Sequence, residues 1–172
     1  YAIAVSLGSF LLIVPVQAVG GGVRKRMSEG IDPGAYLGVG VVVNGALAVA
    51  LCLGVLLAGW LLRTFDPIDA EITRILAGYD AEIAGLVLVT AAYRTVREAI
   101  EAHTQVGRSG LLQGAERVLR TALQVAVLVV GYGVSALVVG HAVSVLVASV
   151  AGVAMLSPRV SLPTREQVES VF

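Results

Sequence analysis

The stretch from residue 33 to residue 62, PGAYLGVGVVVNGALAVALCLGVLLAGWLL, decides the fold because it contains no charged residue. A helix needs about 20 mostly apolar residues to cross about 30 Å of hydrocarbon, so this stretch is long enough to span a membrane. Asp32 and Pro33 mark its start, since aspartate caps free backbone N–H groups and proline suits the first helical turn. The sequence therefore predicts a transmembrane helix over about residues 34–62.

The composition of the whole chain is also typical of a membrane protein. Its 172 residues are 57% hydrophobic and 14% charged, with a mean hydropathy of +0.89. The formal net charge is zero, so bulk charge favours neither nucleic acid nor an anionic surface as partner. The single cysteine, Cys52, excludes an intrachain disulfide and a cysteine-cluster metal site. We therefore expect a polytopic membrane protein in contact with lipids, without a metal or cofactor.

Four further segments are predicted to span the membrane. Two contain no Asp, Glu, Lys or Arg, namely residues 1–23 and residues 134–156. The other two reach membrane length only by including charged residues, and we place them at about residues 79–104 and 111–131. The turn GYGVSA separates the last two spans. Residues 157–172 are predicted to form a cytoplasmic linker, and the chain is expected to be a piece of a longer protein.

The basic residues are divided unequally between the two sets of connections. One set holds ten of them: Arg24, Lys25, Arg26, Arg94, Arg97, Arg108, Arg117, Arg120, Arg159 and Arg165. The other set holds Arg63 and Arg74. Because cytoplasmic loops carry the excess of Lys and Arg, the loop KRMSEG at residues 25–30 and the C-terminal tail are predicted to be cytoplasmic. We therefore expect a multi-pass protein of the cell membrane whose first residue lies outside.

Two of the predicted helices carry polar residues at the same offsets of 0, 3, 4, 7 and 11. The first stripe consists of Arg94, Arg97, Glu98, Glu101 and Gln105. The second stripe consists of Gln113, Glu116, Arg117, Arg120 and Gln124. This spacing places each stripe on one helical face about 100° wide.

The short connection VGRSG at residues 106–110 predicts that these two helices are antiparallel neighbours with facing stripes. Positions whose numbers sum to about 218 then lie opposite: Gln105 and Gln113, Glu101 and Arg117, Glu98 and Arg120, Arg94 and Gln124. Three charged residues have no assigned partner: Arg94, Arg97 and Glu116. If Glu98 pairs with Arg120, the double reversal Glu98→Arg with Arg120→Glu should restore folding that each single reversal loses.

Seven charges on two membrane helices are costly against lipid tails, so they should face protein or water. One interpretation is that they snorkel to the cytoplasmic interface and only join the two helices. The other is an inward-opening aqueous cavity, in which the planar guanidinium groups bind an anion such as a lipid-linked pyrophosphate. Gln17 and Asn44 are candidates for the same cavity, although single amides in membrane helices more often bond a neighbouring helix. His141 is interpreted as structural.

Three segments, in this order, resemble a known family. They are GGGVRKRMSEGIDPG at residues 20–34, EAHTQVGRSGLLQGAERVLRTALQ at residues 101–124, and VLVVGYGVSALVVGHAVS at residues 127–144. They resemble the amino-terminal half of a polysaccharide-biosynthesis flippase, in the superfamily of lipid-linked oligosaccharide exporters and multidrug extrusion proteins. The resemblance extends over about residues 1–156. It implies five helices of a six-helix lobe in a MATE-like transporter fold.

The resemblance further implies a second, pseudo-symmetric lobe outside this chain and a central cavity exposed alternately to the two sides. The substrate it implies is a lipid-linked oligosaccharide, flipped to the outer leaflet. The first two predicted spans carry none of the cavity charges that the family often has there. Cavity roles for the stripe residues therefore rest on their spacing and not on a family motif.

Two other classes of function stay open. A cation-coupled drug exporter of related fold needs an isolated carboxylate in the membrane, whereas the deep acids here have nearby arginines. A non-transporting scaffold or a membrane glycosyltransferase is the other alternative. The candidate acids for sugar chemistry are Asp66, Asp69, Glu71 and Asp80. HExxH, CxxC and GxSxG motifs are absent, so no enzyme is expected. A cleft lined by both stripes would favour transport, and a closed, dry hairpin would favour a scaffold.

Overall fold

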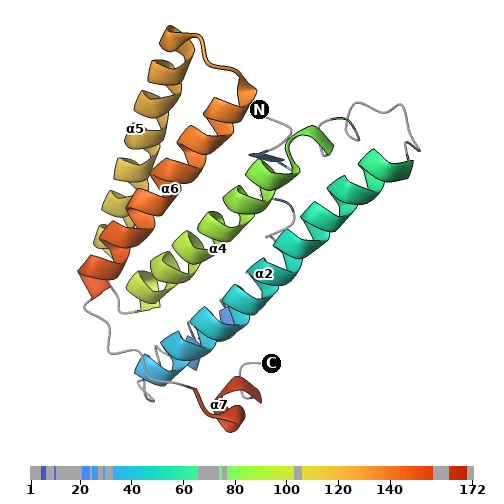
Figure 1. Cartoon of the computed structure of the whole chain (residues 1–172). Helices are drawn as coiled ribbons and strands as arrows, with labels where there is room; N and C mark the ends of the chain where they lie inside the picture. The colour runs from blue at the N-terminus through green and yellow to red at the C-terminus, as the bar shows by residue number, and fades with distance from the viewer. Residues whose placement is uncertain are drawn as a thin grey trace.

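In the computed structural model of this chain, the described elements are helices (Figure 1). The structure describes residues 5–6, 10, 21–23, 25–26, 29, 33–65, 74, 77–102, 106–156 and 163–169. Its elements are α2 (Pro33–Phe65), α4 (Asp80–Ala102), α5 (Val106–Val130), α6 (Val134–Leu156) and α7 (Arg165–Glu169). No strand occurs in these ranges, which confirms the predicted all-α class for them.

The four long helices match the predicted segments, with one correction. We expected residues 106–110 to form a loop, but they form the first turns of α5. The reason is tertiary, because Ser109 is buried and its hydroxyl donates a hydrogen bond of 2.8 Å to Glu101 Oε1 of α4. This bond fixes a stretch whose glycines otherwise disfavour a helix.

The predicted turn between α5 and α6 is confirmed. Gly131 has a φ of 82°, a left-handed conformation that glycine adopts without steric cost. Its N–H donates to Leu128 O, and the N–H of Tyr132 donates to Val127 O, each at 3.1 Å. These two bonds form a Schellman motif, which satisfies the last carbonyl groups of α5 and ends that helix.

The long helices pack in the spatial order α2, α4, α6, α5 (Figure 1). We expected α4 and α5 to be the closest neighbours, but α6 contacts both of them far more extensively than they contact each other. Small residues on α6 explain the difference, because a Cβ on Gly152 would come within 2.5 Å of Val96 on α4 and 3.0 Å of Leu112 on α5. Helix α6 therefore lies between α4 and α5, which the sequence predicted to be direct neighbours.

The outside of the bundle is apolar. Large exposed side chains include Leu53 on α2 and Val129 on α5, at 62% and 81% exposure. Within the described ranges, Gly34–Phe65 and Val134–Leu156 are long and apolar enough to cross a membrane. Only 17% of the apolar window of the first is buried, which is unlike the core helix of a soluble protein. Helices α4 and α5 contain charged residues and do not meet the same criterion of length and apolarity. The five-span topology therefore stays a prediction.

Basic residues segregate to one end of the bundle. The start of α2, the end of α4, the start of α5, the end of α6 and the helix α7 share the lower end in Figure 1. Arg108 and Arg165 therefore lie at that end, whereas Arg63 occupies the last turn of α2 at the other end. Val5 packs against the hydrophobic cluster that contains Val55, and Val23 belongs to the cluster that contains Tyr36, so these two residues of the predicted first span join different clusters of the bundle.

The predicted orientation is testable with single cysteines, because Cys52 is the only native one. In a Cys52→Ser background, we expect a membrane-impermeant thiol reagent added to intact cells to label Thr64→Cys. Arg165→Cys should react only after lysis, because the excess of arginine predicts that this end lies in the cytoplasm. The Cys52→Ser protein without a new cysteine measures background labelling. Labelling of Arg165→Cys alone in intact cells would reverse the assignment.

Candidate functional site

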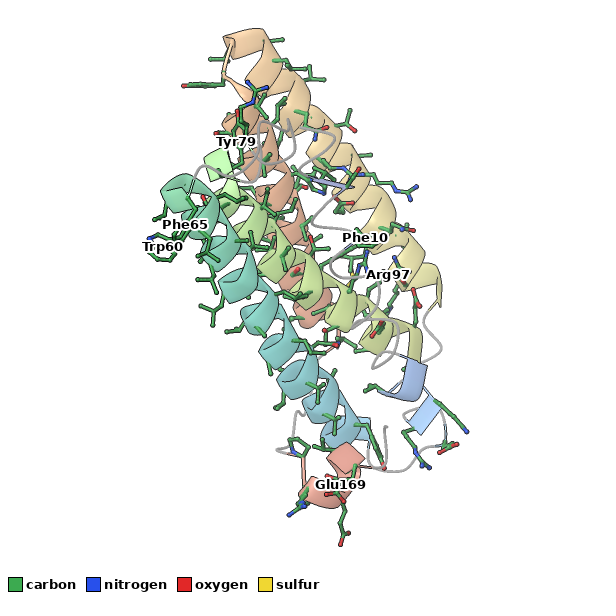
Figure 2. The ribbon with its side chains drawn as sticks, turned by 90° about the vertical axis from the view of Figure 1, so that its right-hand side faces the viewer. Phe10, Trp60, Phe65, Tyr79, Arg97 and Glu169 are labelled. Carbon is green, nitrogen blue, oxygen red and sulfur yellow. The ribbon has the colours of Figure 1, made fainter. Side chains whose placement is uncertain are left out.

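The first stripe lies on the side of α4 opposite its exposed apolar edge. Ala91 packs with the α2 side, and Tyr93 packs with Val145 of α6. The helical period places the stripe between these two contacts. The exposed edge of α4 is formed by Gly85, Leu88 and Ala92. In Figure 2, Arg97 lies on the side of α4 turned away from α2, whereas Trp60 and Phe65 point outward from α2.

The charges of the first stripe are partly paired within their own helix. Arg97 Nε donates to Glu101 Oε1 at 2.9 Å, and Ser109 of α5 donates to the same oxygen at 2.8 Å. Arg97 had no assigned partner in the sequence, so this pair is new. Among the described residues, the structure records neither the predicted pair of Glu101 with Arg117 nor that of Glu98 with Arg120. The first stripe thus reaches α5 through a serine hydroxyl.

The second stripe contributes to a buried network between α5 and α6. Glu116 is 6% exposed and lies 3.7 Å from Arg120 Nη1. The same Nη1 lies 3.1 Å from His141 Nε2. Because arginine only donates, Nε2 is the acceptor and the imidazole is neutral in this arrangement. The oxygen Ser144 Oγ donates to His141 O at 2.7 Å and lies 3.3 Å from Glu116 Oε1. The structure therefore gives Glu116 partners that the sequence did not assign.

Sequence reasoning treated His141 as structural and did not consider Ser144. The available signal was their spacing of three residues, which places two polar groups on one face of an apolar helix. Both side chains are buried. An apolar helix with such a pair indicates a polar neighbour, which here is the second stripe.

Sequence reasoning missed Tyr93, which lies on α4 one helical turn before Arg97. This side chain is 7% exposed and packs among Leu112 of α5 and Val145 of α6. Charges from both stripes act on it, and the groups concerned are Glu116, Arg97, Arg117 and Arg120. Its hydroxyl has no hydrogen-bond partner in the described part of the chain. A tyrosine among alanines and valines is typical of a core position, so its sequence carried no functional signal.

Two arginines supply the surplus positive charge. Arg94 is half-buried and Arg117 is exposed, and neither forms an ion pair with any residue that the structure describes. From the sequence, Arg94 and Arg97 were the arginines without an assigned partner. In the structure Arg97 pairs with Glu101, and Arg117 is the second arginine without an ion pair to a described residue. The remaining stripe residues Glu98, Gln113 and Gln124 are half-buried. Gln17 and Gln105 lie outside the described residues.

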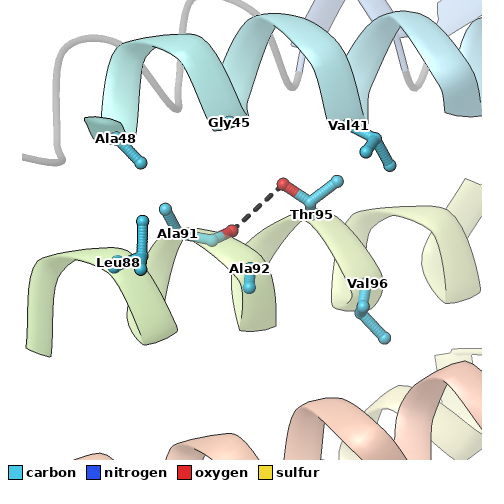
Figure 3. Close-up of a pocket in the computed structure, with 8 residues that line it drawn as sticks. All are labelled: Val41, Gly45, Ala48, Leu88, Ala91, Ala92, Thr95 and Val96. Carbon is cyan, nitrogen blue, oxygen red and sulfur yellow. Dashed lines mark hydrogen bonds between the residues drawn. The ribbon is translucent and has the colours of Figure 1, made fainter. Parts of the chain in front are cut away.

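Asn44 bonds the neighbouring helix, as one of the two sequence interpretations stated. It is 3% exposed, and its Nδ2 donates to Thr95 Oγ1 at 3.0 Å. The Thr95 hydroxyl donates in turn to Ala91 O (Figure 3). Thr95 also lines a cavity of about 240 Å³ between α2 and α4, together with Val41, Gly45, Ala48, Leu88, Ala91, Ala92 and Val96. This cavity opens beside the exposed edge of α4 and not beside the stripe.

Of the acidic residues considered for sugar chemistry, the described part of the chain includes Asp80. Asp80 is 7% exposed, and Arg63 clamps it through Nη2–Oδ2 at 2.6 Å and Nη1–Oδ1 at 3.1 Å. Asp66, Asp69 and Glu71 lie outside the described residues. Across the described ranges, no group of three or more His, Cys, Asp or Glu side chains is placed to hold a metal ion. Asp80 therefore joins two helix ends.

Comparisons with protein families, with curated proteins and with solved structures found no match. The features of the molecule that bear on its function are the charged stripes, the apolar exterior and the buried Tyr93.

Proposed function

We propose that this chain is part of a membrane flippase that moves lipid-linked oligosaccharides to the outer leaflet by alternating access. The observation that carries the proposal is a buried polar cluster at Glu116, which is 6% exposed and lies 3.7 Å from Arg120 Nη1 beside His141 and Ser144. That cluster lies inside a bundle whose exterior is apolar. Charged groups placed this way serve a polar guest better than they serve lipid contact.

The excess of arginine favours an anionic guest. The two stripes together carry four arginines and three glutamates, which gives a formal charge of +1. Two of those arginines, Arg94 and Arg117, form no ion pair with a described residue. A guanidinium group donates two parallel hydrogen bonds, which matches the oxygens of a phosphate or pyrophosphate. A lipid-linked pyrophosphate sugar combines that anion with a lipid tail suited to the apolar exterior.

The flippase proposal requires partners beyond this chain. A second lobe of the same protein would close the cavity, and five spans with a cytoplasmic tail would hold this lobe in the cell membrane. In this scheme the stripe residues line the inward-open cavity, with the arginines on the headgroup. Membrane lipids would cover the exposed apolar faces of α2 and α6.

One observation favours the cation-coupled exporter as a second candidate. Glu116 is a buried carboxylate, and its partners Ser144 Oγ and Arg120 Nη1 lie at 3.3 and 3.7 Å, which are long distances for a charged hydrogen bond. A cation-coupled exporter needs a carboxylate inside the membrane, and Glu116 is buried in this way. The adjacent Arg120 pairs with Glu116, so this carboxylate is not isolated. We therefore place the flippase first.

Loss of both surplus arginines tests the flippase proposal. In proteoliposomes containing the protein assembled with its second lobe, the variant Arg94→Ala/Arg117→Ala should flip a fluorescent lipid-linked oligosaccharide about tenfold more slowly, because charge-assisted bonds to the headgroup are lost. Arg165→Ala is the control, since its exposed ion pair with Glu169 lies on α7. Wild-type flipping by the double variant would refute the assignment of these arginines.

A further inference from the structure

We propose that the hydroxyl of Tyr93 is a hydrogen-bond donor in a binding site for a phosphate or pyrophosphate group, formed with Arg97 and Arg117. This inference deepens the proposed function, on which it rests, by naming the place where the anionic group is held. None of the sequence patterns pointed to Tyr93. Its burial, its unused hydroxyl and the charges around it are the three observations that carry the argument.

The first step concerns the unused hydroxyl. Tyr93 is more than nine-tenths buried, and its Oη has no partner in the described part of the chain. Buried polar groups in native proteins are nearly always hydrogen-bonded, because leaving one unsatisfied costs free energy. An isolated buried hydroxyl in the middle of three packed helices therefore indicates that an acceptor from outside the chain completes it.

The second step concerns the sign of the acceptor. Three cationic groups, Arg97, Arg117 and Arg120, and one anionic group, Glu116, act on Tyr93. Because Arg97 pairs with Glu101 and Arg120 pairs with Glu116, the positive charge of Arg117 remains as the excess. An acceptor that carries negative charge is therefore favoured over a neutral carbonyl or a water molecule. Phosphate oxygens meet that requirement and accept several donors at once.

The third step concerns which arginines have donors to spare. The imidazole of His141 lies 3.1 Å from Arg120 Nη1, so Arg120 is already engaged. Glu101 accepts from the Nε of Arg97, which leaves the two terminal NH₂ groups of Arg97 for an anion. Arg117 forms no ion pair with a described residue and lines an open surface groove of about 680 Å³ along α5. Arg97 lies one helical turn after Tyr93 on α4, and Arg117 lies on α5, which packs against Tyr93 through Leu112.

Tyr93→Phe separates this site from a purely structural role. Without an anion, the variant should unfold at the same temperature as the wild type or higher, because an unsatisfied buried hydroxyl is removed. With an anion, it should lose one charge-assisted hydrogen bond and bind about tenfold more weakly. A structural hydroxyl with a hidden partner would show the opposite pattern, with lower stability and unchanged binding.

The experiment measures thermal unfolding and binding of the purified protein in lipid nanodiscs, with inorganic pyrophosphate in one arm and a short prenyl diphosphate in the other. Tyr36→Phe is the matched control, because it removes a second buried tyrosine hydroxyl on α2. We expect Tyr93→Phe, and not Tyr36→Phe, to weaken binding. An effect confined to the prenyl diphosphate identifies a lipid headgroup as the ligand, and an effect in both arms identifies the phosphate chemistry itself.

Two results would overturn the inference. One is wild-type affinity of Tyr93→Phe in both arms, and the other is a wild-type protein that binds neither compound. The flippase proposal fails separately: if Arg94→Ala/Arg117→Ala flips lipid-linked sugar normally while Tyr93→Phe binds pyrophosphate more weakly, the site stands and the proposed transport role falls. If flipping is lost but Tyr93→Phe binds normally, only the site falls.

Discussion

Replacing Gly152 with leucine is expected to lower the free energy of unfolding by about 3 kcal/mol, at the upper end of the usual cost of overpacking. Gly152 lies where α6 crosses both α4 and α5. A Cβ there would already come within 2.5 Å of Val96 Cγ1 and 3.0 Å of Leu112 Cδ2. Three further carbon atoms have no space unless α6 moves away from its neighbours. The expected result is loss of the helix order α4, α6, α5.

The measurement is an unfolding titration of the purified protein with sodium dodecyl sulfate. Gly54→Leu is the matched control, because a Cβ at that helical glycine meets nothing within 4 Å. The control should unfold like the wild type or be slightly more stable, since leucine is a better helix former than glycine. Equal stability of Gly152→Leu and Gly54→Leu would contradict the close approach that places α6 between α4 and α5.

Removing Arg63 is expected to destabilise the protein more than removing Arg63 and the charge of Asp80 together. The Asp80 carboxylate is buried against Gly59 and receives two hydrogen bonds from Arg63, at 2.6 and 3.1 Å. Arg63→Ala leaves that carboxylate without its partner in a buried position, which is strongly unfavourable. Adding Asp80→Asn removes the uncompensated charge and should recover part of the lost stability.

Thermal unfolding of Arg63→Ala, Asp80→Asn and the double variant forms a complete cycle. Arg74→Ala is the control, because Arg74 is an exposed arginine in the sequence between α2 and α4. It should unfold like the wild type. If the effects of Arg63→Ala and Asp80→Asn simply add in the double variant, the clamp does not couple α2 to α4.

The helices and the turn between α5 and α6 were predictable because their causes are local. The uncharged run that follows Asp32 forms α2, and Gly131, which can adopt a positive φ, ends α5. The offsets within each stripe follow from the period of a helix, so each set shares a face whatever surrounds it. The unequal division of Lys and Arg is equally a property of the sequence.

The partners of the stripe residues were not predictable in the same way. Facing positions on neighbouring helices predicted ion pairs across the α4–α5 connection. The structure instead records Arg97 with Glu101 and Arg120 with Glu116, each within one helix. The contact between Arg120 and His141 depends on α6, which the sequence did not place against the second stripe. The unsatisfied hydroxyl of Tyr93 follows only from the packing of three helices.

The sequence by itself determined that this chain is helical, that its surface is apolar and that seven of its charged residues lie in two stripes, because hydropathy and helical period act over a few residues. The tertiary structure decided that α6 lies between α4 and α5, that Glu116 lies buried in contact with α6, and that Tyr93 is buried among α4, α5 and α6. The physical reason is steric. Which helices approach closely depends on small residues such as Gly152 meeting particular side chains on other helices, and no local pattern records that fit.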